Sequence, residues 1–143
     1  MKHKGALMEY SQERSNDLMR AYDEYISSCD YIRMPDVYRA IVNMPSARFW
    51  VSDKRANTMV SAIMRGTVDL STMRPLKREM FEEIYRRVVE LRKSKPQLST
   101  FELCSIVVAQ EAPKFYLTHG SAKIMVCRAR KEWIRRKKRR LGL

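Results

Sequence analysis

Apolar residues recur along this chain at intervals of three and four, and no stretch alternates polar and apolar residues long enough to predict a sheet. A clear example places residues i, i+3, i+4 and i+7 on one helix face, namely Ala56, Met59, Val60 and Ile63. Only four Gly and five Pro interrupt the helical pattern in 143 residues. The sequence therefore predicts an all-α fold with enough apolar residues to bury a core.

The apolar pattern repeats at an offset of 66 residues. Residues 36–65 align with residues 102–131 without a gap, and 13 of the 30 pairs are identical or chemically close. Ser52 and Thr118 precede the two copies of the apolar face, where each can accept a backbone N–H as a helix N-cap. Repeated apolar positions are expected to form core. The identical pairs are Val42/Val108, Phe49/Phe115, Ala56/Ala122, Met59/Met125 and Val60/Val126.

Each copy is expected to hold three helices. The predicted ranges are 12–28, 36–43 and 52–65 in the first copy, then 76–93, 100–110 and 118 to about 138 in the second. This divides the chain into a flexible N-terminal segment at 1–11, a trihelical unit at 12–66, a linker at 67–75, a second unit at 76–134 and a basic tail at 135–143.

The trihelical layout resembles the helix-turn-helix arrangement, in which the last helix enters the major groove of DNA. The resemblance is to a layout and not to a particular family. The connections at 44–51 and 110–117 are longer than the usual turn of about 3 to 4 residues, which favours a looser variant.

The net charge of the chain indicates what class of partner to expect. The chain has 29 Lys and Arg against 16 Asp and Glu, a formal net charge of +13. Such an excess repels itself in a compact chain and favours a polyanionic partner, with nucleic acid first and DNA ahead of RNA. A basic surface that aids only solubility is the simpler alternative. A membrane surface ranks lower, because few apolar residues follow Ile134, and no stretch approaches the length of a membrane span.

The C-terminal region concentrates the positive charge. Nine basic residues within 128–140 oppose only Glu132, which places +8 of the net charge there. We expect this tail to fray beyond Ile134 unless a polyphosphate neutralises it, and to supply affinity without sequence choice. A nuclear localisation signal is the other interpretation if the source is eukaryotic.

The candidate binding residues face away from the predicted core on the third helices, precede those helices, or belong to the tail. Arg and Lys can meet guanine edges or phosphates, Asn can pair with adenine, and Ser and Thr can bond phosphate oxygens. The aromatic pairs before the third helices could stack bases, but we favour packing over the first helical turn. The candidate nucleic-acid-binding residues are Arg48, Lys54, Arg55, Asn57, Thr58, Lys114, Ser121, Lys123, Arg128, Lys131, Arg135, Arg136, Lys137, Lys138, Arg139 and Arg140.

Groups suited to catalysis or metal binding are sparse. His3 and His119 have no carboxylate or cysteine at ligand spacing, and the sequence lacks Gly-rich phosphate loops and nucleophile motifs. Cys29, Cys104 and Cys127 have no C-x-x-C spacing and are expected to be reduced core thiols. We therefore expect no enzyme activity, no metal and no cofactor.

A cluster of carboxylates at Glu79, Glu82 and Glu83 has basic neighbours on all sides. Lys77, Arg78, Arg86 and Arg87 surround these carboxylates, which predicts a salt-bridged surface rather than a catalytic site.

These observations predict a cytoplasmic DNA-binding protein, associated with the nucleoid, or nuclear in a eukaryote. A regulatory, mobile-element or phage accessory role fits, with two units on adjacent grooves and the tail on phosphate. The alternatives are an RNA-binding or RNA-chaperone accessory protein, or a structural adaptor in a nucleoprotein or virion assembly with a protein partner or a second copy of itself.

Overall fold

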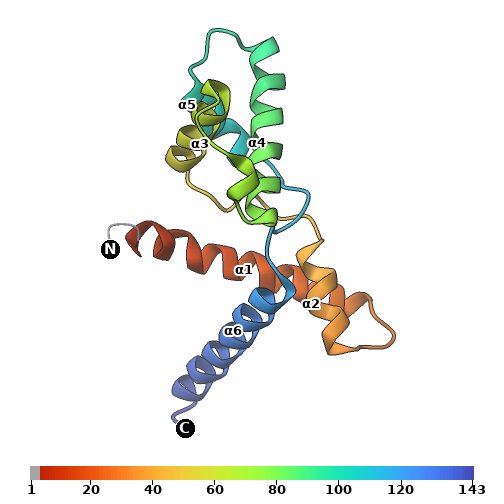
Figure 1. The fold of residues 1–143 in the computed structure, drawn as a ribbon. Helices are drawn as coiled ribbons and strands as arrows, with labels where there is room; N and C mark the ends of the chain where they lie inside the picture. The colour runs from red at the N-terminus through yellow and green to blue at the C-terminus, as the bar shows by residue number, and fades with distance from the viewer. Residues whose placement is uncertain (1–3) are drawn as a thin grey trace. The chain divides into compact units, whose positions relative to one another are not determined.

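The computed structural model describes residues 4–143, and the predicted all-helical class is confirmed for them. Six α-helices and one short 3-10 helix account for the regular structure of these residues (Figure 1). Their bounds are α1 (Lys4–Ser28), α2 (Met34–Val42), α3 (Asp53–Arg65), η1 (Leu70–Thr72), α4 (Pro75–Ser94), α5 (Thr100–Val108) and α6 (His119–Arg140).

Local capping chemistry sets where several helices begin and end. The hydroxyl oxygens of Ser52 and Thr118 accept the backbone N–H groups of Arg55 and Ser121, each at 3.1 Å, so both predicted N-caps are confirmed. α5 opens with a capping box between Ser99 and Glu102. α3 ends at Arg65 and is capped by Gly66, whose φ of 70° is a conformation that glycine adopts without strain.

Two helix ends differ from the sequence prediction. α1 begins at Lys4 rather than at residue 12, so most of the segment expected to be flexible is helical; residues 1–3 lie outside the described part of the chain. α6 continues to Arg140, past Ile134, where fraying was expected. Glu132 forms ion pairs with Arg135 and Arg136 one turn later, which stabilises the helix locally against the repulsion of its cations.

The helices group into two compact units. Unit 1 consists of the described residues up to Met44 and of Leu117–Leu143. The first part contains α1 and α2, and the second contains α6. Unit 2 is Pro45–Tyr116 and contains α3, η1, α4 and α5. This grouping differs from the tandem division at 12–66 and 76–134, because α3 packs on α4 and α5 whereas α6 packs on α1 and α2.

Unit 2 has the larger core. Phe81, Ile84 and Val88 of α4 repeat at the spacing of one helix face, and all three are buried against α5 and α3. Phe49, in the segment that leads into α3, is also fully buried in this cluster. Leu103 contributes from α5.

Unit 1 is built in the same way on a smaller core. Leu18 and Ala21 of α1 are fully buried, as are Ile41 of α2 and Val126 of α6. α1, α2 and α6 all pack on one another. Among the five identical pairs of the sequence alignment, the valine, phenylalanine and alanine pairs are buried, which confirms their assignment to core, whereas the methionine pair is half-buried.

The three thiols occupy different environments. All are free; Cys104 is buried, Cys29 is half-buried and Cys127 is exposed on α6. The prediction of a core position is therefore correct for Cys104 and wrong for Cys127, which is exposed although its neighbour Val126 is buried.

Candidate nucleic-acid interface

The exposed face of α3 is basic near its N-terminal end. Lys54, Arg55 and Thr58 are exposed and Asn57 is half-buried. The acid of this helix, Asp53, is used within unit 2: its carboxylate oxygens accept the Lys54 backbone N–H at 2.9 Å and the Ser105 hydroxyl at 3.2 Å. Of the four candidates predicted on α3, three are therefore on the surface.

α6 presents a second basic face. Ser121, Lys123, Arg128 and Lys131 are all exposed, as the sequence predicted. Ile124 is also 54% exposed beside Lys123, so this face combines cations with an apolar side chain. Such a mixture suits contact with base edges, including the thymine methyl group.

The last turns of α6 form the most strongly charged segment. The exposed side chains of Arg135, Arg136, Lys137, Lys138, Arg139 and Arg140 lie on a continuous helix. Glu132 pairs with the first two of them, at 2.9 and 3.3 Å. The Lys137 ammonium lies 4.8 Å from the ring centroid of Trp133, a cation–π contact on the surface.

Arg48 and Lys114, predicted as equivalent phosphate contacts, both have partners inside unit 2. The Arg48 guanidinium donates to the carbonyl oxygens of Phe49 and Val51, each at 3.0 Å, and so holds the segment that leads into α3. The Lys114 ammonium forms an ion pair with Glu79 at 2.5 Å. Binding phosphate would require these side chains to give up those partners.

The aromatic residues before the third helices are mostly packed inside the protein and not exposed to solvent. Phe49 and Phe115 are buried, and the rings of Phe49 and Tyr116 lie 6.0 Å apart and nearly parallel. The pKa of Tyr116 is raised to about 12. Burial is the main cause, and the negative charges of Glu83 and Glu79 also raise it. The favoured packing role thus agrees with their burial.

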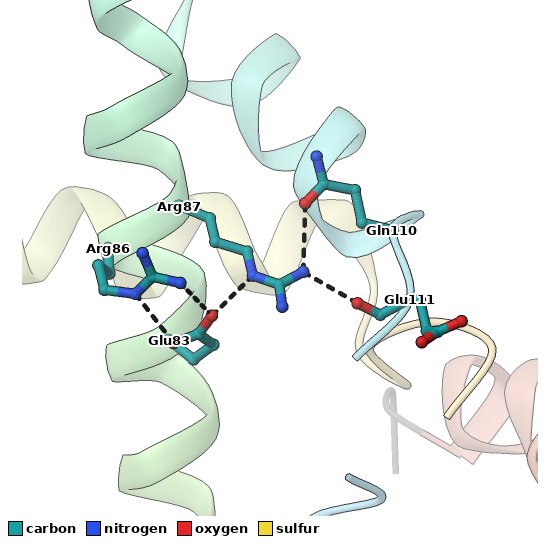
Figure 2. A network of polar contacts seen from close by, with 5 residues as sticks. All are labelled: Glu83, Arg86, Arg87, Gln110 and Glu111. Carbon is teal, nitrogen blue, oxygen red and sulfur yellow. Dashed lines mark hydrogen bonds and ion pairs between the residues drawn. The ribbon is translucent and has the colours of Figure 1, made fainter. Parts of the chain in front are cut away.

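A polar network ties α4 to the segment after α5. Arg87 donates to Glu83 at 2.7 Å, to the Gln110 side chain at 3.2 Å and to the Glu111 carbonyl oxygen at 2.9 Å (Figure 2). Arg86 also bonds Glu83, at 2.6 Å, and this bond is the main reason that the pKa of Glu83 lies below its usual range. The salt-bridged surface expected here is therefore confirmed for Glu83.

Two cations outside the predicted binding residues lie near Arg55; one of them, Lys77, was expected to take part in the salt-bridged surface of α4. Arg74 and Lys77 flank the first turn of α4, and their positive charges, together with Arg55, occupy one region of unit 2. The pKa of Lys77 is lowered, first by burial and then by the positive charges of Arg55 and Arg74. Their position near Arg55 could not be predicted, because they are far from Arg55 along the chain.

No metal-binding cluster of three or more His, Cys, Asp or Glu side chains is present in the part of the chain that the structure describes. None of the described helices has both the length and the apolar composition needed to cross a bilayer. Comparison of the chain with family models, with curated proteins and with solved structures finds no match.

Proposed function

We propose that this protein binds duplex DNA, with α3 and α6 as the helices that face the grooves and the end of α6 along the phosphate backbone. The observation that carries this proposal is α6 itself. Ten Lys and Arg side chains stand on this helix against the single carboxylate of Glu132. An exposed helix with so little internal compensation gains free energy when it displaces counterions from a polyphosphate.

The helix bounds support an internal repeat behind this arrangement. α2 and α5 run over Met34–Val42 and Thr100–Val108, and α3 and α6 begin at Asp53 and His119, in both cases 66 positions apart. We propose that the two units are copies of one trihelical unit with exchanged third helices. Each unit would then resemble a helix-turn-helix in which the last helix is not continuous with the second.

The kinds of exposed side chain on the third helices favour contacts with base edges in the major groove. Arg128 and Lys123 of α6 have the donors that meet guanine edges, and Ile124 between the two core positions Ala122 and Val126 can contact a thymine methyl. Specific binding would come from these side chains, and general affinity from the tail.

A titration of a labelled random-sequence duplex at several salt concentrations tests the proposal. We expect log K to fall linearly with log salt, by about 0.9 per phosphate neutralised. An affinity that stays flat from about 50 to about 200 mM salt would reject it.

Single-stranded nucleic acid, RNA included, is the second candidate, and the exposure of Trp133 favours it. The indole is 62% exposed on a helix full of cations, a combination suited to stacking on an unpaired base. Competition between duplex DNA, single strands and structured RNA for the intact protein separates the two candidates.

A further inference from the structure

Three basic side chains gather where α3 packs on α4: one on each helix and one on the residue that precedes α4. The Arg55 guanidinium of α3 lies 5.8 Å from the ring centroid of Phe81, which is fully buried on α4. Lys77 precedes Phe81 by one helical turn, so it shares that side of α4 with the ring. Arg74 directly precedes α4 and acts on Lys77 electrostatically, as Arg55 does.

Four carboxylates of unit 2 have partners other than this cluster. Glu79, Glu83 and Glu90 form their ion pairs with other cations, which are Lys114, Arg86, Arg87 and Lys93. Asp53, the acid on α3, accepts from Ser105 on α5. Among the residues that the structure describes, none of the three cations is in an ion pair.

Like charges brought together in this way cost stability, and an anion between them removes the cost. The pKa of Lys77 is lowered first by burial and then by this repulsion. A phosphate group suits the position, because guanidinium groups bind it with two parallel hydrogen bonds and an ammonium adds a point charge.

We propose that Arg55, Arg74 and Lys77 form a phosphodiester-binding site on unit 2, which holds a backbone phosphate of the nucleic acid that α3 contacts. This inference rests on the proposed function and deepens it. It gives Arg55 a sequence-independent role in place of the base-edge contact expected from its position on α3. The cluster then fixes where α3 sits on the duplex.

The test compares Arg74→Gln/Lys77→Gln with a control, Lys93→Gln/Lys95→Gln, which removes the same charge from exposed positions of unit 2. Binding of random duplex is measured across salt for both variants and for the unchanged protein, and circular dichroism checks that each is folded. We expect the test variant alone to lose about 0.9 of the salt slope, or more if the cations bind separate phosphates. Arg55→Gln should lose a similar amount on all duplex sequences alike.

The possible failures are distinguishable. If the unchanged protein shows a strong salt slope and the Arg74/Lys77 variant shows the same slope, this site is wrong while the proposed function stands. If the unchanged protein binds no duplex, the proposed function fails and the site fails with it. NMR titration of the Lys77 ammonium gives a second measurement, since its pKa should rise when a duplex is added; an unchanged pKa would overturn the site.

Discussion

Ser46 and Ala112 exchange two backbone hydrogen bonds, each of 2.9 Å, although they are 66 positions apart in the sequence. This separation equals the offset of the sequence alignment, so the bridge joins two aligned positions. Both residues are almost completely buried in unit 2. The bridge joins the connection that leads into α3 to the connection that follows α5, near the points where the chain enters and leaves this unit.

The Ser46 hydroxyl adds a buried bond at this bridge. It donates to the carbonyl oxygen of Arg48 at 2.7 Å. We expect Ser46→Ala to lower the free energy of unfolding by about 1 kcal/mol, because the hydroxyl bond cannot be replaced by solvent as easily at a buried site. Urea unfolding measures the change. Ser94→Ala removes an exposed hydroxyl bond to the Leu91 carbonyl oxygen and should cost less; equal costs would contradict the argument.

Removal of the two N-caps distinguishes exchanged third helices from tandem units. Ser52→Ala should destabilise α3 by about 1 kcal/mol, and Thr118→Ala should do the same to α6. Because α3 packs on α4 and α5, Ser52→Ala should speed amide hydrogen exchange there and leave α1 and α2 unchanged. Thr118→Ala should show the opposite pattern.

Residue-resolved hydrogen exchange by NMR reads out both variants. The cap-preserving substitutions Ser52→Thr and Thr118→Ser are the controls and should change little. Faster exchange of α1 and α2 in Ser52→Ala would indicate tandem packing instead.

Local chemistry explains which parts of this fold the sequence could predict. The start of α3 follows from Ser52 and the apolar spacing after it, and the all-helical class follows from the same periodicity. The packing of α3 on α4 and α5, and of α6 on α1 and α2, could not be predicted, since the two aligned segments carry similar apolar faces. Ala56 could have packed on either pair of partner helices, and only the three-dimensional path of the connections decides.

The candidate site shows the same division between local and distant determinants. Exposure of Lys123 and Arg128 follows from their positions opposite the core face of α6. The ion pair of Lys114 with Glu79 and the approach of Arg55 to the first turn of α4 join residues far apart in sequence. No spacing rule along the chain indicates such partners.

Neutralising the end of α6 should weaken binding to all sequences alike. The variant carries Gln at Lys137, Lys138, Arg139 and Arg140, which keeps good helix formers and retains the Glu132 ion pairs with Arg135 and Arg136. We expect the salt slope to fall by about 0.9 for each phosphate that the variant no longer neutralises. Fluorescence anisotropy with two unrelated duplexes measures it.

A control for net charge carries four Gln substitutions at exposed cations outside α3 and α6, which are Arg33, Arg39, Lys93 and Lys95. If this control lowers the slope as much as the α6 variant, total charge and not the end of α6 determines affinity.

Trp133 separates duplex binding from single-strand binding. Its indole is exposed, with the Lys137 ammonium over the ring, so removing it costs the fold little. We expect Trp133→Ala to leave duplex affinity within about twofold, whereas base stacking on the ring would make the loss for single strands about 1 to 3 kcal/mol. Trp133→Phe is the matched control, because it retains an aromatic face. A large loss on duplex alone would contradict both interpretations of the side chain.

The buried thiol of Cys104 should make stability depend on alkaline pH. Burial is the main reason that the pKa of Cys104 is raised from 9.0 to about 11 in the folded protein. Above pH 9 the unfolded chain therefore loses this proton before the folded chain does, so the free energy of unfolding falls as pH rises from about 9 to about 11, by up to about 2 kcal/mol. Urea unfolding at pH 7.5, 9 and 10.5 measures the fall.

Two variants serve as the test and its control. Cys104→Ala costs stability at every pH by leaving a small cavity, but it should reduce the fall in stability with pH. Cys127→Ala, at an exposed position, should retain the fall. An unchanged fall in Cys104→Ala would assign the effect to other groups, with Tyr116 the first to examine, because burial raises its pKa to about 12.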